Sequence, residues 1–272
     1  MNNLFRNSRR KLSQGLLFWR EFGEGPYVIF LHGAWNDSCE WLSVMELLSH
    51  YHCFALDLFG FGESDYPNVH YSVDLLLESL AEFIDSLKLE KVYLVGHSLG
   101  GWIAASYALK YSQQVAGLVL LAPEGVEIQG QEKRLQKMRQ LVKRSPFMFK
   151  LLRLLRPITK MLGWDQENEQ DWQLYQTLRK YPTACKILFQ RQQAEINAEL
   201  LHERLYSLEM PVLILQGGED TPHSLAMSKV YSQAPSSELK IIAHGKSDLP
   251  ESCAGIVAAH IREFIKSQDL SY

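Results

Sequence analysis

Short runs of apolar residues recur along the chain, and most of them end at a glycine, an aspartate or a proline. Runs of four to eight residues that are apolar at nearly every position are typical of strands buried on both faces of a parallel sheet. The sequence therefore predicts six such strands, which cover residues 27–33, 53–60, 92–98, 117–123, 211–220 and 238–245.

Several stretches between and after these runs have a different period. Their apolar residues recur every three or four positions, as in a helix with one buried face. Helices are predicted over residues 72–90, 99–110 and 254–267. Strand, helix and strand in succession favour an α/β fold with a doubly wound, mostly parallel sheet.

The alternation stops after residue 124 and resumes near residue 208. Four helical stretches are predicted in this interval, over residues 131–144, 146–162, 166–180 and 184–206. A run of helices between two strands of one sheet indicates an insertion into a single core. We expect a core of residues 15–124 and 208–272, a helical cap insertion of residues 125–207 and a basic N-terminal tail of residues 1–14.

Composition agrees with a globular protein. Of the 272 residues, 46% are hydrophobic and 22% are charged, which argues against disorder, and the net charge of −3 gives no general attraction for nucleic acid. The longest apolar stretch, residues 115–123, is shorter than the roughly 18 residues that suggest a membrane span. The first residues lack the apolar core of a secretory signal, and the four cysteines lack metal-site spacing. A cytoplasmic protein is expected.

The clearest chemical signal is the pentapeptide Gly-His-Ser-Leu-Gly around Ser98, which has the pattern G-x-S-x-G. It lies where a predicted strand turns into a predicted helix. A sharp turn of this kind lifts the serine hydroxyl above the sheet, and the amides at the start of the helix can stabilise a developing oxyanion. The pattern therefore predicts that Ser98 is a nucleophile.

The order of motifs along the chain resembles the α/β-hydrolase fold family. LHGAW (31–35), DLFGFGESD (57–65), GHSLGG (96–101) and GGED (217–220) follow one another as in that family. The resemblance implies that the backbone amides of Ala34 and Leu99 form the oxyanion hole, that the insertion caps the active site and that no metal or organic cofactor takes part. It also suggests structural roles for His32 and His97.

A serine hydroxyl needs a base to accept its proton and an acid to orient that base. The family order of serine, acid and histidine is met by Asp220, which follows a predicted strand. Glu124, directly after another strand, is the alternative acid. Glu219 has the wrong spacing.

The histidine departs from the family pattern. A strict match places Lys246 at the position of the base, whereas His244 lies two residues earlier. Three interpretations stay open: a reshaped loop lets His244 reach Ser98, His223 serves instead, or the triad is incomplete. A protonated lysine has no lone pair, so Lys246 could act as the base only with a strongly lowered pKa.

The predicted cap is basic. Residues 132–160 contain ten lysines and arginines and one acidic residue, a net charge of +9. On a helical projection, Lys150, Arg153, Arg156 and Lys160 fall within roughly 120° of arc, opposite phenylalanines and leucines. This pattern suits either a cap helix packed on the core with solvated charges, or peripheral contact with an anionic membrane surface. The basic segment contains no groove-reading motif, so nucleic acid binding is not expected.

The sequence predicts a serine hydrolase of the carboxylic ester class, whose substrate has a hydrophobic acyl or alcohol part. Ser98 would attack the carbonyl, His244 would relay the proton and Asp220 would orient the imidazole. Related α/β-hydrolases use the same triad for carbon–carbon cleavage, acyl transfer and cofactor-free peroxidation, so the reaction type stays open. The alternative is a catalytically weak or silent protein of the same fold that binds an apolar ligand or a partner.

Overall fold

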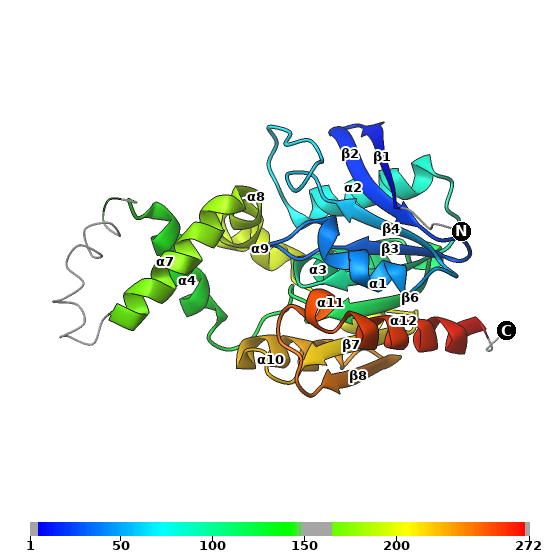
Figure 1. Ribbon diagram of the computed structural model, residues 1–272. Helices are drawn as coiled ribbons and strands as arrows, with labels where there is room; N and C mark the ends of the chain where they lie inside the picture. The colour runs from blue at the N-terminus through cyan, green and yellow to red at the C-terminus, as the bar shows by residue number, and fades with distance from the viewer. Residues whose placement is uncertain (1–4, 146, 148–164, 270–272) are drawn as a thin grey trace. The chain divides into compact units, whose positions relative to one another are not determined.

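The computed structural model of the protein describes residues 5–145, 147 and 165–269 (Figure 1). Within them, eight strands form one sheet in the order β1-β2-β4-β3-β5-β6-β7-β8. The six strands from β3 to β8 pair in parallel, which confirms the α/β class with a mostly parallel sheet. They are β3 (Tyr27–Leu31), β4 (His52–Asp57), β5 (Val92–His97), β6 (Val115–Leu121), β7 (Val212–Gly217) and β8 (Ser237–Ile242).

An antiparallel hairpin precedes the predicted strands. Strand β1 (Arg6–Leu12) pairs with β2 (Gly15–Phe22), and β2 pairs antiparallel with β4. Most of the segment expected as a basic tail is therefore an edge strand. Its Arg9 is exposed, and the guanidinium lies 2.7 Å from a Glu63 carboxylate oxygen and 5.4 Å from the centre of the Phe18 ring of β2. A charged edge strand resists pairing with other chains. Because its sequence is mostly polar, the pattern of apolar runs does not predict it.

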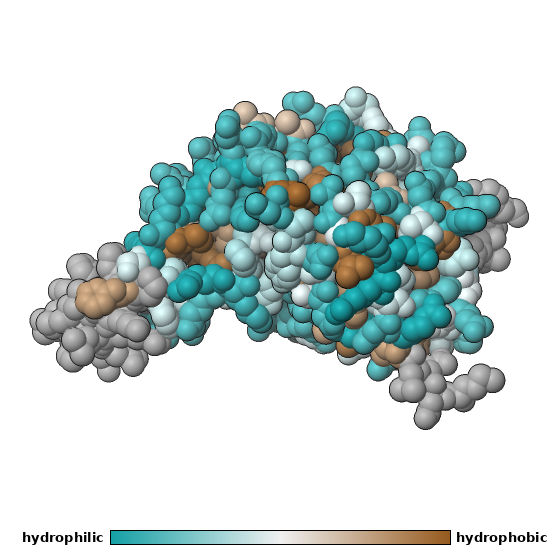
Figure 2. Space-filling view, turned by 90° about the horizontal axis from the view of Figure 1, so that it is seen from above, coloured by the Kyte–Doolittle hydropathy of each residue, from teal (hydrophilic) through white to brown (hydrophobic). Residues whose placement is uncertain are grey.

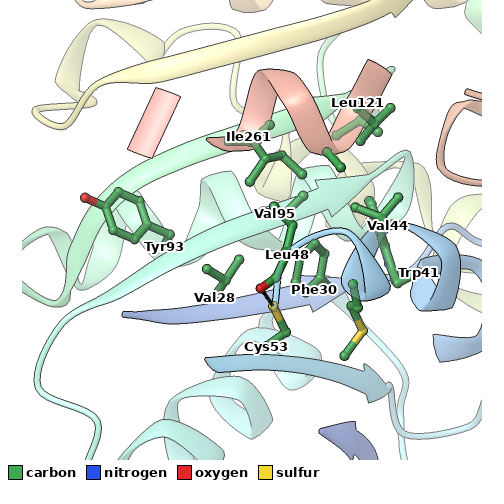
Figure 3. Packing of buried hydrophobic residues seen from close by; sticks show 14 of the residues in the cluster. Val28, Phe30, Trp41, Val44, Leu48, Cys53, Tyr93, Val95, Leu121 and Ile261 are labelled. Carbon is green, nitrogen blue, oxygen red and sulfur yellow. Dashed lines mark hydrogen bonds between the residues drawn. The ribbon is translucent and has the colours of Figure 1, made fainter. Parts of the chain in front are cut away.

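Helices cover both faces of the sheet. On one face, α1 (Leu42–Glu46), α11 (Leu249–Ser252) and α12 (Ala254–Asp269) pack over a hydrophobic core that Figure 3 shows from close by. That core includes Phe30, Trp41, Val44, Val95, Leu121 and Ile261. On the other face, Phe83 of α2 (Val73–Ser86) packs edge-on against Trp19 and Phe54. Two more helices, α3 (Leu99–Lys110) and α10 (Pro222–Tyr231), follow β5 and β7.

The chain divides into two compact units, residues Met1–Ile128 with Glu199–Tyr272, and residues Gln129–Ala198. The second unit contains α4 (Gln131–Lys143), α7 (Asp165–Lys180), α8 (Pro182–Cys185) and the π-helical turn Lys186–Gln190, and most of α9 (Gln193–Glu199). The single helix expected over 184–206 is broken, because Arg191 has an extended backbone. Arg191 also donates to the Ile187 carbonyl, and Arg139 donates to that of Phe189, so the last carbonyls of this turn have side-chain partners.

Part of the predicted basic surface is neutralised within the second unit. Lys137 and Arg144 lie 2.8 and 3.5 Å from the carboxylate oxygens of Asp171. The helix predicted over 146–162, with Lys150, Arg153, Arg156 and Lys160, lies outside the described residues apart from residue 147. Across the described part of the chain, no helix is long and apolar enough to cross a membrane. On the face seen in Figure 2, hydrophobic residues form small groups among hydrophilic ones.

Candidate active site

Ser98 lies at the sharp turn between β5 and α3, in the backbone conformation that the sequence motif predicts. Its φ is +50° and its ψ is −112°, a region that residues other than glycine rarely adopt. The turn is held by the neighbouring strand, since the Ser98 N–H donates to the Leu121 carbonyl at 2.9 Å. A strained residue that the surrounding sheet fixes in place is a frequent feature of active sites.

The glycines of the motif allow this turn to pack closely. A Cβ on Gly96 would lie 2.4 Å from the Gly100 carbonyl oxygen, and a Cβ on Gly100 would lie 2.2 Å from that of Leu31. Both distances are far inside van der Waals contact, and both obstacles are backbone atoms that cannot rotate away. The close approach of α3 to β3 therefore depends on Gly100 having no side chain.

We expect Gly100→Ala to lower the free energy of unfolding by about 2–3 kcal/mol, the upper part of the roughly 1–3 kcal/mol seen when a packed site is overfilled, because the obstacles to this Cβ are backbone atoms. Gly255→Ala in α12 is the matched control. A Cβ at Gly255 has no heavy atom within 4 Å, and alanine is the better helix former, so this variant should be neutral or up to about 1 kcal/mol more stable. Urea denaturation of both variants measures the difference. Equal stability of the two would contradict the packing argument.

The predicted oxyanion donors border the turn. Leu99 is the first residue of α3, and the N–H groups of a first helical turn have no partner within the helix. The loop after β3 lies beside them, because a Cβ placed on Gly33 would lie 3.6 Å from Cβ of Ser98. Ala34 follows in that loop and is fully buried.

Two buried side chains fix the loop after β3. The Nδ1 of His32 lies 2.8 Å from the Gly33 carbonyl oxygen, and its Nε2 accepts the Leu58 N–H at 3.1 Å, so His32 carries its proton on Nδ1. The Asp57 carboxylate accepts the N–H of Ser38 and of Glu63, each at 2.7 Å. These bonds give His32 a structural part in the loop.

The structure adds Glu40, which the sequence analysis missed. Glu40 is 2% exposed, and its two carboxylate oxygens have different partners. Oε1 accepts the Gly33 N–H at 2.9 Å, and Oε2 lies 3.2 Å from Nδ1 of His97. No motif marks this carboxylate. The only signal in the sequence is an acidic residue directly before Trp41, a tryptophan that is fully buried.

His97 is linked to three parts of the chain. Its Nε2 lies 2.8 Å from the carbonyl oxygen of Ser247, in the loop after β8. Burial of the ring lowers the pKa of His97, but the charge and hydrogen bond of Glu40, the Ser247 carbonyl and the charge of Asp220 outweigh burial, so the pKa is raised above its ordinary value.

Asp220 follows β7 and has a fixed orientation. Its Oδ1 accepts the Thr221 N–H at 2.6 Å, and its Oδ2 accepts the side-chain amide of Gln216 at 3.2 Å. Thr221 in turn caps α10 by accepting the N–H of Ser224. The carboxylate is half-buried at the carboxyl end of the strand, near enough to His97 to affect its pKa.

His244 has a different partner from the predicted one. Its side chain is 93% exposed, and Nδ1 lies 3.1 Å from Oε1 of Glu219. Among the contacts of the described residues, neither Ser98 nor Asp220 is a partner of its ring. The reason is local, because the chain turns at the end of β8, where the Gly245 N–H donates to the Ile242 carbonyl and leaves His244 at the tip.

The loop continues from this turn toward the elbow. A Cβ on Gly217 would meet the carbonyl oxygens of Gly245 and Lys246, at 2.5 and 2.7 Å, at the end of β7. Ser247 then reaches His97 at the end of β5. Ser247 thus lies beside the elbow, whereas the backbone of Gly245 and Lys246 lies against the end of β7. The Lys246 side chain is exposed.

The two alternative residues lie at neighbouring strand ends. Glu124 is joined to the elbow through its backbone, because its N–H donates to the Ser98 carbonyl at 3.1 Å and its own carbonyl accepts the Tyr231 hydroxyl at 2.6 Å. His223 lies in the first turn of α10. Its Nε2 is buried and has no hydrogen-bond partner among the described residues.

In the part of the chain that the structure describes, three of the four cysteines have a raised thiol pKa. Burial raises the pKa of Cys53 and of Cys185 to about 12, so both stay protonated and unreactive. Burial and the neighbouring Asp37 raise the pKa of Cys39 to about 11. No group of three or more histidine, cysteine, aspartate or glutamate side chains there could hold a metal ion.

Comparison with known proteins identifies the fold family. A family model described as the alpha/beta hydrolase fold matches residues 26–249. An uncharacterized protein of Mycobacterium tuberculosis is 36% identical over 109 residues, which are 40% of this chain and 32% of that protein. The 2-hydroxy-6-oxo-2,4-heptadienoate hydrolase of Pseudomonas putida is 35% identical over 117 residues, 40% of this chain and 41% of the enzyme. The match thus spans well under half the length of either relative.

Among solved structures, the haloalkane dehalogenase DbeA from Bradyrhizobium elkani is similar over 99% of this chain and 100% of its own, with a TM-score of 0.74 and 19% identity. At this level of identity the likeness concerns the fold.

Proposed function

The chain belongs to the alpha/beta hydrolase fold family, and on this premise we propose that it is a serine hydrolase that cleaves an ester with a hydrophobic acyl or alcohol part. The observation that carries the proposal is the strained backbone of Ser98, at φ +50° between β5 and the first turn of α3. The sheet holds this unfavourable conformation, which presents the hydroxyl where a helix start can stabilise negative charge. The hydrolase of Pseudomonas putida agrees with the broad reaction class.

In the proposed reaction, Ser98 attacks the ester carbonyl while its proton passes to a base. The carbonyl oxygen becomes an oxyanion, which the backbone N–H groups of Ala34 and Leu99 would bind. Each such donor is worth about 3–4 kcal/mol in the transition state. The alkoxide leaves with the proton that the base returns, and water then cleaves the acyl-serine by the reverse sequence of proton transfers.

We assign the base to His244, with Asp220 as the acid that orients it. The contact of His244 with Glu219 joins two side chains that are 93% and 49% exposed, and pairs of this kind contribute about 0–1 kcal/mol. Releasing it therefore costs little. The turn at residues 242–245 must open to bring the imidazole over β7 toward Ser98, and binding of the substrate supplies the interaction that favours the opened turn.

One observation favours the second candidate, a silent protein of this fold that binds an apolar ligand or a partner. The described contacts pair His244 with Glu219, and the residue of this loop that contacts the elbow is Ser247. If that arrangement persists with ligand bound, Ser98 has no base.

A fluorophosphonate probe separates the two candidates, because it reacts with a serine only when that serine is activated. We expect one probe per chain, located at Ser98 by peptide mass spectrometry. Heat-denatured protein should not react, which controls for unspecific labelling of surface hydroxyls. Absence of labelling in the folded protein would favour the binding protein.

The basic insertion adds a proposal about location: peripheral contact with an anionic membrane surface. It rests on the sequence of residues 146–162, which lie outside the described residues apart from residue 147. Replacing Lys150, Arg153, Arg156 and Lys160 with glutamine should remove most of the preference for anionic over neutral vesicles, at about 1 kcal/mol per basic residue. Replacing Lys137, which is already paired with Asp171, should have a smaller effect. Equal vesicle binding by the wild type and the fourfold variant at low salt would contradict the proposal.

A further inference from the structure

The pair formed by Glu40 and His97 connects the segments that carry the proposed catalytic groups. Glu40 accepts the N–H of Gly33, next to the oxyanion donor Ala34. His97 directly precedes Ser98, and its other nitrogen reaches the carbonyl of Ser247 in the loop that carries His244. The pair is buried, with side chains 1% and 12% exposed. The bonds of Glu40 to Gly33 and to His97 are therefore shielded from water, whereas the bond of His97 to Ser247 ends at an exposed loop residue.

The partners of His97 determine its protonation. The Ser247 carbonyl can only accept a hydrogen bond, and so can the Glu40 carboxylate. Both ring nitrogens of His97 must then donate, which requires the imidazolium. The charged groups facing the ring are Glu40 from the loop after β3 and Asp220 from the loop after β7. In the loop after β8, Ser247 lies between Lys246 and Asp248, whose side chains are exposed.

We propose that Glu40 and His97 are positioning residues. They hold the loop after β3 and the loop after β8 in their positions beside the Ser98 elbow as long as His97 is protonated. This inference rests on the proposed function, because the position of the oxyanion donors matters only if Ser98 reacts.

The proposal predicts a loss of activity at alkaline pH. When His97 loses a proton, the ring keeps one N–H, and either the bond to Glu40 or the bond to Ser247 is lost. The raised pKa of His97 agrees with a loss on the alkaline side. Because the folded protein binds the proton more tightly than the unfolded chain, the stabilisation is complete below about pH 6.5 and is lost as the pH rises through the folded pKa.

Glu40→Gln separates geometry from charge. The glutamine carbonyl can accept the Gly33 N–H, and its amide can donate to an unprotonated Nδ1 of His97. The neutral ring then still donates from Nε2 to Ser247. In this variant all three hydrogen bonds form with a neutral His97 ring, so deprotonation of His97 at alkaline pH no longer breaks any of them. Glu40→Ala removes the bonds to Gly33 and to His97.

The test measures the rate constant of fluorophosphonate labelling from pH 6 to 10. We expect Glu40→Ala to be slower than the wild type by about 100-fold near pH 7, as expected for a displacement of about 1 Å in an active site, and the difference should narrow as the wild type declines at alkaline pH. Glu40→Gln should stay within about threefold of the wild type near pH 7 and lack the alkaline decline of the wild type. Glu46→Gln removes a charge from an exposed position of α1 and should match the wild type. An alkaline decline in Glu40→Gln like that of the wild type would overturn the proposal, even if Glu40→Ala fails to fold.

A second measurement does not need catalysis. Nitrogen-15 NMR of the histidine rings should show both nitrogens of His97 protonated at pH 7 in the wild type, and one protonated in Glu40→Gln. If the probe fails to label the wild type but the NMR result is as expected, the proposed function is wrong and the link stands as part of the fold. A neutral His97 in the wild type at pH 7 would overturn the inference whatever the labelling shows.

Discussion

Replacing Ser98 with alanine is expected to abolish ester hydrolysis and fluorophosphonate labelling. Removal of a nucleophile of this kind lowers kcat by about 10⁶-fold, because the remaining groups have no covalent step to assist. The fold should survive, since the change removes one oxygen from a residue whose hydroxyl makes no hydrogen bond in the described structure. A p-nitrophenyl ester measures the activity, and the urea midpoint measures the fold. Alanine at a strained φ of +50° leaves the backbone cost as it is for serine.

If Ser98→Ala keeps its esterase activity, another residue is the nucleophile. Ser106 is a suitable control on α3, because it is buried and its hydroxyl has no hydrogen-bond partner among the described residues. Ser106→Ala should leave both activity and labelling unchanged. If the two variants behave alike, Ser98 is not the nucleophile.

Replacing His244 with alanine is expected to lower kcat nearly as far as Ser98→Ala, because the members of a triad act as a unit. The stability should hardly change, since the ring is 93% exposed and its contact with Glu219 is at the surface. A large kinetic effect from a residue with so few contacts would indicate a chemical role. The measurement is kcat on the p-nitrophenyl ester, with the urea midpoint as the control for folding.

Two further variants identify the base. His223→Ala should keep most of the activity. Glu219→Gln should raise activity modestly, because it weakens the contact that holds His244 away from Ser98. An active wild type with a silent His244→Ala would show that the base is another residue. Lys246→His then tests the position that a strict match to the family pattern assigns to the base.

The parallel strands could be predicted because burial on both faces requires a continuous run of apolar residues, such as residues 27–31. The β1–β2 hairpin has no such run in β1. Strand β1 is an edge strand whose arginines face solvent, and its pairing with β2 depends on backbone groups that the sequence does not display. The sequence pattern therefore finds the centre of the sheet and misses its edge.

The site divides in the same way. The Ser98 turn follows from local chemistry, because only glycines fit at positions 96 and 100, and a short motif records that constraint. The link between Glu40 and His97 joins residues 57 positions apart, and the pattern G-x-S-x-G leaves position 97 open, so no spacing rule records the pair. His244 lies at the tip of the turn that the Gly245 N–H and the Ile242 carbonyl close, and no pattern in the sequence records where that turn falls.

The hydrogen bond from His97 to Ser247 spans 150 residues of chain, and it affects when the site can form during synthesis. The ribosome releases the elbow long before the loop after β8, with the entire insertion between β6 and β7 in the interval. Until the last strand docks, the elbow lacks one of its supports, and contacts of such sequence separation close slowly. A nascent chain would therefore carry a folded serine turn without a working centre, and any truncation before residue 247 should fold incompletely and stay inert.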